Sequence, residues 1–356
     1  MQDTIDTLPA DELYQQFQQL RHERKLRHRD AAHALGVSEG EVIAAAVGRC
    51  ESLAAVRLRG PWPELMARVP ALGRVMALTR NESAVHEKTG QYADLSHQGP
   101  VGMALGREID LRIFYMHWAE VYAVSEPGEA GVQRSLQAFD AWGDAIHKIF
   151  LRDESDLAAW MDLVEAFAHP DQSAGMSVRR ERPVLVVRPD AEIDREAFHA
   201  AWAAMKDTHE FFPLLGKFKL ARTQALRLAA PDCAWQVEFG AARQMLETAA
   251  ADGLSIMCFV GNPGMIQIHT GPVERIALRG PWLNVLDPGF NLHLREDHIA
   301  SAWVVTKPTS DGLVTSLELF DAQGETIAMF FGERKPGQAE LAAWRSLALS
   351  LPRLAA

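Results

Sequence analysis

The sequence predicts an α+β protein made by tandem duplication of one antiparallel-sheet domain with flanking helices. Three observations support this fold class: a long internal repeat, alternation of apolar and polar residues within the repeated segments, and amphipathic stretches at helical spacing outside them. The chain has 356 residues, of which 48% are hydrophobic and 23% charged, so it is long enough for two globular domains with separate cores.

The repeat is clearest in the segments 134–150 and 315–331, which read RSLQAFDAWGDAIHKIF and TSLELFDAQGETIAMFF. Ser135 of the first segment recurs as Ser316 of the second, and we call the difference between these two residue numbers the repeat offset. The same offset relates further pairs of identical residues: Asn81 and Asn262, Thr89 and Thr270, Gly90 and Gly271, Leu111 and Leu292, Gly131 and Gly312. Because all these pairs are separated by the same number of residues, the second half of the chain is a copy of the first, which indicates a duplicated domain.

Within each copy, the repeated segment is expected to form a strand, a turn and a second strand. Apolar and polar residues alternate there, and the FDAxG stretch supplies the Asp and Gly that favour a turn. Upstream, the stretch 111–124 also alternates, which places Arg112, Phe114, Met116 and Trp118 on one sheet face. Helices are expected to cover the sheets around residues 9–30, 154–168, 194–208, 241–252 and 338–349.

The domain boundaries follow from the repeat and from local composition. We assign residues 1–170 to the first repeat, a helical start followed by sheet, and residues 193–356 to the second repeat. Between them, residues 171–192 are polar and contain Pro and Gly, so this segment is predicted to be a linker.

Composition excludes several classes of protein. A net charge of −11 disfavours nucleic-acid binding, because the phosphate backbone attracts clustered positive charge. The chain has no run of about 18 apolar residues, and its start lacks the basic and then apolar order of a secretory signal. We therefore expect a cytoplasmic protein that does not insert into a membrane.

One motif keeps a different class open. Residues 29–42, RDAAHALGVSEGEV, have the outline of a helix-turn-helix that could read DNA. The same outline also fits a simple corner between two helices. Because the chain as a whole is acidic, we do not expect DNA binding and keep a DNA-binding regulator only as a minor alternative.

The start of the second repeat contains the strongest candidate for a metal ligand. Asp194 can cap a helix on which Phe198, Trp202 and Met205 form one apolar stripe, and His209 falls on the same stripe at i+11 from Phe198. Pro213 then disfavours helical geometry at the preceding residue and is expected to end the helix. His209 could offer a ring nitrogen to a metal beside Phe211 and Phe212, or it could be a core histidine satisfied by a hydrogen bond.

Several segments together resemble a known family. They are KDTHEFFPLL (206–215), MALTRNESAVHEKTGQY (76–92), GPWLNVLDPGFNLHL (280–294) and AWVVTKPTSDGLVTSLELFDAQGETIA (302–328). Matched in the order in which they occur along the chain, they look like the bacterial cytoplasmic haem-utilisation proteins of the HemS/HmuS type, also called haemin-degrading factors. The resemblance covers nearly the whole chain, including the duplication.

The resemblance implies that haem b binds, as ligand or substrate, in a cleft between sheet and helices. His209 would be the axial ligand of the haem iron, and a neutral imidazole suits that role. Arg112 would reach the opposite side with Phe114 beside it, and it would be the catalytic residue if the protein is an enzyme. The remaining implied contacts are Arg222, Lys307 and Arg334 to the propionates and Phe259 to the macrocycle, while Phe331 stands where some relatives have tyrosine.

Two classes of function remain open. The favoured one is a carrier that takes haem from the cytoplasmic side of an importer to a haem oxygenase in the course of iron acquisition, acting as a monomer or dimer. The alternative is an enzyme that cleaves the porphyrin with oxygen and an external reductant, since the sequence contains no nucleotide or flavin fingerprint of its own.

Overall fold

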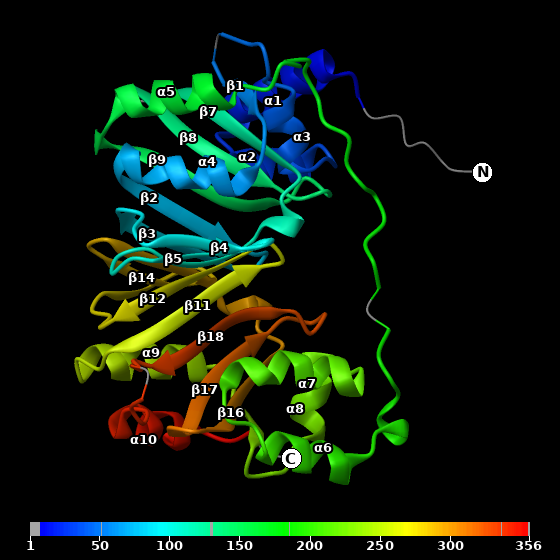
Figure 1. Ribbon diagram of the computed structural model, residues 1–356, viewed down its shortest axis with the longest axis vertical. Coiled ribbons are helices and arrows are strands. Elements are labelled where there is room, and N and C mark those ends of the chain that lie inside the picture. Colours follow the sequence, from blue (N-terminus) through cyan, green and yellow to red (C-terminus); the bar gives the residue numbers. More distant parts are fainter. Residues whose placement is uncertain (1–7, 51, 129–130, 185, 336, 355–356) are drawn as a thin grey trace. The chain divides into compact units, whose positions relative to one another are not determined.

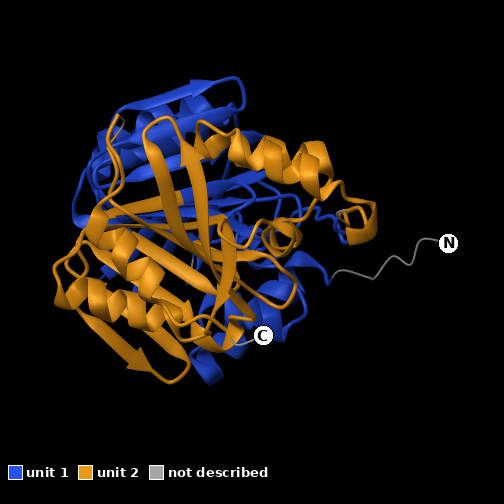
Figure 2. Cartoon of the chain, turned by 90° about the horizontal axis from the view of Figure 1, so that it is seen from below, with its two compact units in different colours: residues 1–79, 88–182, 262–266 blue, residues 80–87, 183–261, 267–356 orange. Residues whose placement is uncertain are grey.

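The computed structural model describes residues 8–50, 52–128, 131–184, 186–335 and 337–354 (Figure 1). The chain divides into two compact units, coloured separately in Figure 2. Unit 1 comprises Met1–Thr79, Lys88–Arg182 and Asn262–Ile266, and unit 2 comprises Arg80–Glu87, Pro183–Gly261 and Gln267–Ala356. Each unit thus takes in a short segment from the other half of the sequence, and the repeat boundaries drawn above stay a prediction.

Unit 1 contains two groups of antiparallel strands. The first runs in the order β1 (Ala54–Leu58), β7 (Glu120–Gly128), β8 (Gly131–Phe139), β9 (Ala145–Ser155) and β2 (Gly73–Arg80). The second runs β6 (Asp110–Phe114), β5 (Val101–Leu105) and β4 (Leu95–Gln98).

Unit 2 repeats this arrangement. Its first group is β10 (Ala234–Val237), β16 (Ser301–Thr309), β17 (Gly312–Phe320), β18 (Thr326–Gly332) and β11 (Ile256–Asn262). Its second group is β15 (Phe290–Arg295), β14 (Trp282–Asp287) and β13 (Ile276–Arg279), and two further strands, β3 (Ala84–Gly90) and β12 (Met265–Gly271), are divided between the units. Strands β16 and β17 begin at the repeat offset from β7 and β8, which confirms the predicted duplication and fold class.

Helices cover the first strand group of each unit on both faces. The unit 1 helices are α1 (Ala10–Arg24), α2 (His28–Ala34), α3 (Glu39–Ala44), α4 (Trp62–Arg68) and α5 (Leu157–Phe167), and those of unit 2 are α6 (Arg195–Ala203), α7 (Phe211–Phe218), α8 (Arg222–Leu228), α9 (Ala241–Ala251) and α10 (Ala342–Ser350). Helices α6 to α8 bury Val305 and Phe320 on one sheet face. Helices α9 and α10 pack against the other face, through residues such as Leu317 and Leu319.

The FDAxG turn has the same construction in both copies. The Asp140 carboxylate accepts hydrogen bonds from the backbone amides of Trp142 and Asp144, at 2.8 and 2.9 Å. Asp321 does the same for the corresponding amides of the second copy. Gly143 adopts φ +78°, a left-handed conformation that L side chains rarely adopt. The backbone of this turn therefore favours glycine at this position.

We expect Gly143→Ala to lower the free energy of unfolding by about 2–4 kcal/mol. A Cβ atom there would clash with Ser38 Oγ, in addition to the cost of the left-handed backbone. Gly280→Ala is the control, because Gly280 also has a positive φ, +58°, but its Cβ would meet open space. Equal losses for the two variants in chemical denaturation would show that the contact with Ser38 is unimportant.

The predicted helix over 9–30 is wrong as a single element. Lys25 takes a left-handed conformation with φ +52° and ends α1, so α2 starts separately at His28. The predicted face of 111–124 is also only partly right. Arg112 and Phe114 do share a face of β6, but a 3-10 turn follows at Tyr115–His117 and carries Met116 out to 54% exposure.

Helix α3 corresponds to the DNA-reading helix of the helix-turn-helix outline. All six of its residues are buried, and Ser38 caps it in a capping box with Glu41. A recognition helix must present side chains to a groove. The helical corner at 29–42 is therefore part of the unit 1 core, and the structure lends no support to DNA reading through it.

A buried histidine in unit 1 makes stability depend on pH. His147 is 2% exposed, its Nε2 lies 2.6 Å from the Tyr92 hydroxyl, and its Nδ1 lies 2.8 Å from Thr79 Oγ1. Burial lowers the pKa of His147 to about 3. Above pH 6.5 the ring is neutral in both the folded and unfolded chain, whereas below it only the unfolded chain binds the proton.

Stability should therefore fall by about 1.4 kcal/mol per pH unit at this site as the pH drops from 6.5 towards 3. We expect urea denaturation between pH 7 and 5 to show this loss in the parent protein and not in His147→Gln. The free-energy difference between the two proteins should shrink as the pH falls. A difference that stays constant over this range would mean that folding does not lower the pKa of His147.

Among the described helices, none combines the length and the apolar character needed to cross a membrane.

Candidate functional site

His209 lies between two helices of unit 2. Helix α6, capped by the Asp194 side chain as predicted, ends at Ala203, and a 3-10 turn over Thr208–Glu210 precedes α7. The apolar stripe expected on α6 is buried at Phe198, Trp202 and Met205.

His209 itself does not continue that stripe, and its side chain is 90% exposed. The helix expected over 194–208 stops early, and a new one starts at Phe211. Pro213 sits in the first turn of α7, where its missing N–H costs no hydrogen bond, so the prediction that Pro213 ends a helix is wrong. The alternative of a core histidine is also excluded by the exposure.

A carboxylate fixes the orientation of the His209 ring. Asp207 Oδ1 accepts a hydrogen bond from the His209 backbone amide at 2.8 Å and lies 2.6 Å from Nδ1 of the ring. The hydrogen bond from that amide holds the pKa of Asp207 below its usual value, with help from the His209 ring and from Arg334. Nε2 bonds to none of the residues that the structure describes, so it is the nitrogen available to a metal.

Half-buried apolar side chains line the sheet face on the side of α6 to α8. In the strand register Glu318 lies opposite Met329, and Met329 lies opposite Phe259, so the three share one face. Phe331, two residues from Met329, shares it too, and its ring meets that of Phe259 edge-on with centroids 5.0 Å apart. Two half-buried aromatic rings on a sheet face suit a flat apolar ligand.

A buried carboxylate forms ion pairs with two cations at the edge of this face. Glu318 has no exposed surface, and it accepts hydrogen bonds from Lys307 Nζ at 2.7 Å and from Arg222 Nε at 2.8 Å. Both cations also lie over the Phe211 ring, Lys307 at 4.5 Å and Arg222 at 5.0 Å from its centroid. We call Arg222, Lys307 and Glu318 the charged triad.

Burial and charge oppose each other within the triad. Burial alone would raise the pKa of Glu318, but Arg222 and Lys307 bring it well below the usual range. Burial lowers the pKa of Lys307, against the attraction of Glu318. With two cations and one carboxylate, the triad keeps one net positive charge next to the apolar face. Arg222 is its accessible member, with 23% exposure against 4% for Lys307.

Arg334 adds a third cation near His209. It follows β18 and lies close enough to Asp207 to attract that carboxylate. Its Nε is buried and has no hydrogen-bond partner in the described part of the chain. A buried donor without a partner favours an anionic ligand at this position.

The first copy differs from this cationic arrangement. At the repeat offset, its counterpart of Glu318 is the neutral Gln137, and its counterpart of Met329 is Lys148. Lys148 forms a buried ion pair with Glu39, an acid that is the first residue of α3. In the second copy, the helix α8 begins instead with a base, Arg222. The second copy therefore holds an uncompensated positive charge where the first holds a neutral pair.

Two of the residues that the resemblance implies belong to unit 1. Arg112 and Phe114 lie on β6, and both are half-buried. The Arg112 guanidinium forms an ion pair with Asp110 and donates a hydrogen bond to the Leu111 carbonyl. Its role opposite His209 stays a prediction.

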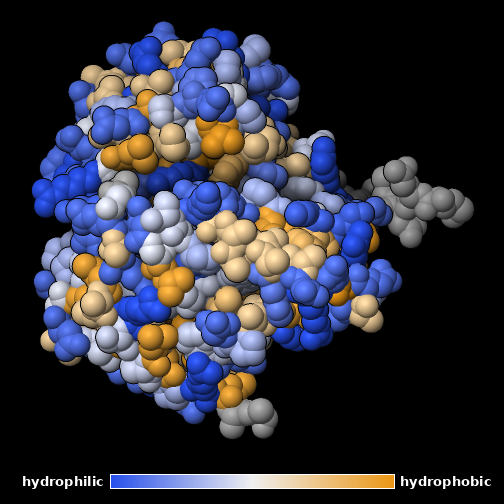
Figure 3. Space-filling model, turned by 60° about the horizontal axis from the view of Figure 1, so that its bottom comes forward, coloured by the Kyte–Doolittle hydropathy of each residue, from blue (hydrophilic) through white to orange (hydrophobic). Residues whose placement is uncertain are grey.

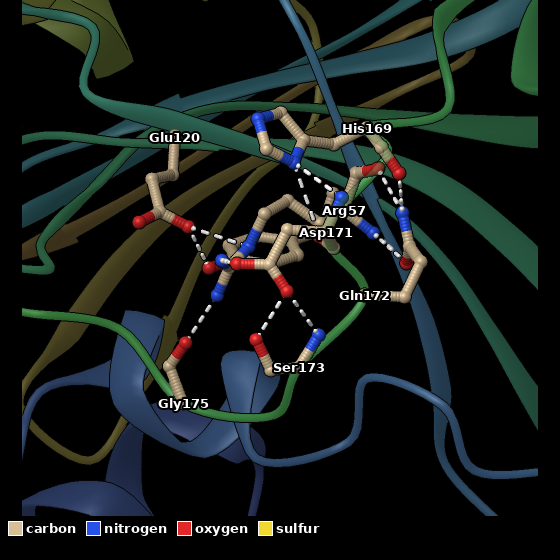
Figure 4. Close-up of polar contacts among 8 residues, drawn as sticks. Arg57, Glu120, His169, Asp171, Gln172, Ser173 and Gly175 are labelled. Atoms are coloured by element: carbon tan, nitrogen blue, oxygen red, sulfur yellow. Dashed lines mark hydrogen bonds and ion pairs between the residues drawn. The ribbon is translucent and has the colours of Figure 1, made fainter.

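Unit 1 contains a separate polar cluster, shown in Figure 4. Arg57 of β1 donates a hydrogen bond to the Gly175 carbonyl and pairs with Glu120 at 3.3 Å, while Gln172 donates one to the Arg57 carbonyl at 2.9 Å. A cavity of about 510 Å³ lies beside it, lined in part by Leu13 and Met176. These contacts attach the start of the segment predicted as a linker to β1, so their role is structural.

Large apolar side chains are exposed at scattered positions. On the face shown in Figure 3, apolar groups are interspersed among hydrophilic ones. Phe212 is 79% exposed and follows His209 closely in the chain. It offers apolar surface next to the candidate ligand.

Two residues of the site were missed in the sequence. Glu318 could have been suspected because it occupies a strand position whose repeat counterpart, Gln137, is also polar between apolar neighbours. Asp207 could have been suspected from its spacing, since an Asp two residues before a His can both cap a turn and reach the ring.

Comparisons with known proteins agree with the duplicated fold. The model of the haemin-degrading HemS/ChuX domain matches the chain twice, over residues 36–167 and 219–351. The hemin transport protein HmuS of Yersinia pestis is 40% identical over 337 residues, which are 94% of this chain and 95% of that protein. Among solved structures, the heme-binding protein PhuS of Pseudomonas aeruginosa in its holo form gives a TM-score of 0.94 at 47% identity, covering 97% of this chain and 100% of that one.

A second solved structure belongs to ChuS, an E. coli heme oxygenase. It gives a TM-score of 0.86 at 38% identity and covers 96% of this chain and 99% of that chain. The chain therefore belongs to the haemin-degrading HemS/ChuX family and carries two copies of its domain.

Proposed function

We propose that this chain binds one haem b through its second copy and carries it in the cytoplasm from an importer to a haem oxygenase. The observation that carries the proposal is His209, an exposed imidazole braced by Asp207 next to an apolar, cationic sheet face. An imidazole is a common axial ligand of haem iron. Carboxylates such as the propionates need cationic partners.

The residues present fit this ligand. Phe259 and Phe331 offer aromatic surface, and exposed Phe212 adds more beside His209. Arg334 offers a buried, unpartnered donor within the described chain, and Arg222 presents the net positive charge of the triad. Lys307, being 4% exposed, acts by helping to hold Arg222 and Glu318 in place.

Two similar proteins support the carrier role. HmuS of Yersinia pestis and HemS of Yersinia enterocolitica are hemin transport proteins, at 40% and 39% identity. PhuS is a heme-binding protein. The alternative, oxidative cleavage of the porphyrin, is supported by ChuS, a heme oxygenase at 38% identity. In that case we propose Arg112 as the catalytic residue.

The two functions differ in what happens after binding. The purified protein is saturated with haemin, catalase is added to remove free peroxide, and a reductant is supplied in air while the Soret band is recorded. A Soret band that persists supports the carrier. Loss of the band with formation of an absorbing tetrapyrrole product, unaffected by catalase, would overturn the carrier and establish the enzyme.

A further inference from the structure

The contact between Asp207 and His209 constrains which ring nitrogen carries the proton. Asp207 Oδ1 is 2.6 Å from Nδ1, and a carboxylate can only accept a hydrogen bond. A neutral His209 ring must then carry its proton on Nδ1 and leave the lone pair on Nε2. Free histidine favours the opposite tautomer, so the carboxylate has to act to select this one.

The position of Asp207 is itself fixed. Asp207 Oδ1 also accepts a hydrogen bond from the His209 backbone amide at 2.8 Å, and Asp207 is the N-cap of the 3-10 turn over Thr208–Glu210. The Glu210 carboxylate accepts a hydrogen bond from the backbone amide of Lys206 at 3.1 Å. This bond closes the loop that carries Asp207 and His209. The carboxylate and the ring thus belong to one short, locally hydrogen-bonded segment.

We infer that Asp207 is a positioning residue that sets the Nδ1–H tautomer of His209 and donates electron density to the ring when Nε2 binds iron. A carboxylate partner on the far ring nitrogen makes a histidine ligand more basic and fixes its orientation. The inference rests on the proposed function only for its second half, because the tautomer exists in the protein without haem.

The first test uses the protein without haem. Nitrogen-15 NMR of the imidazole rings at pH 8 reports which nitrogen is protonated, and His209 is assigned as the signal lost in His209→Ala. We expect the Nδ1–H tautomer in the parent protein and a shift to Nε2–H in Asp207→Ala. Asp194→Ala is the matched control, because Asp194 caps α6 in the same way without contacting an imidazole among the described residues.

The second test uses the haem complex. Asp207→Asn keeps an oxygen that can accept both hydrogen bonds but removes the charge, so the fold and the cap should persist. We expect the iron–histidine stretching band of the ferrous complex to move to lower frequency in this variant, and Asp207→Ala to weaken haem binding about 10–100-fold. Asp194→Ala should leave both readouts unchanged.

The outcomes separate the two claims. If the parent protein shows Nε2–H, Asp207 does not set the tautomer and the positioning role is wrong. If Asp207→Asn leaves the stretching band where it was, the claim that Asp207 donates electron density to the ring is wrong, even though haem still binds. If no Soret band forms with any variant or with the parent protein, the proposed function itself fails, and the tautomer result stands by itself.

Discussion

His209→Ala is expected to weaken haem binding by on the order of 100-fold or more. Loss of a residue that merely supports a metal ligand costs about 10–100-fold in affinity, and loss of the ligand should cost at least as much. The side chain is 90% exposed, so its removal should not disturb the core. The measurement is a haemin titration followed at the Soret band, together with the free energy of unfolding of the haem-free variant.

His97→Ala is a suitable control, since His97 is another exposed histidine, on β4 in unit 1. It should bind haem as the parent protein does. Unchanged affinity and an unchanged spectrum in His209→Ala would remove His209 from the site, and an unfolded variant would show that its effect is structural.

Glu318→Leu should be among the most destabilising single changes in unit 2. The substitution leaves Lys307, 4% exposed, as a buried cation without its partner, and breaking a buried ion pair from one side costs about 3–5 kcal/mol. Urea or guanidinium denaturation of the haem-free protein measures this loss.

The double variant Glu318→Leu with Lys307→Met separates charge from packing. It removes the buried cation along with its partner, so most of the lost stability should return. If the double variant is as unstable as Glu318→Leu alone, the cost lies in the shape of the side chain rather than in the buried charge. Gln137→Leu in the first copy supplies the corresponding change without a charge.

Much of the fold could be predicted because its signals are local or repeated. The constant repeat offset established the duplication, and the Asp140 turn was visible because turn chemistry needs Asp and a glycine with positive φ. The cap at Asp194 was predicted for the same reason. In the turn and the cap, neighbouring residues determine the structure, and the duplication shows itself because the two copies still share identical residues.

The sequence predicted less well those features whose structure depends on contacts between residues far apart in the chain. A proline breaks a helix when it is interior but is tolerated in the first turn, as Pro213 is in α7, which begins at the buried Phe211. The charged triad joins Arg222, Lys307 and Glu318, which no periodicity connects. The helix-turn-helix outline at 29–42 could not be told from a simple helical corner by its sequence, because only the packing of α3 in the core of unit 1 distinguishes the two.

A stoichiometric haemin titration tests the central claim most directly. Among the described residues, the second copy alone combines an exposed, carboxylate-braced imidazole with an uncompensated positive charge. Soret absorbance should therefore rise to a sharp break at one equivalent of haemin per chain. A spectrum identical to that of free haemin throughout the titration, or a break at two equivalents, would contradict a single site at His209.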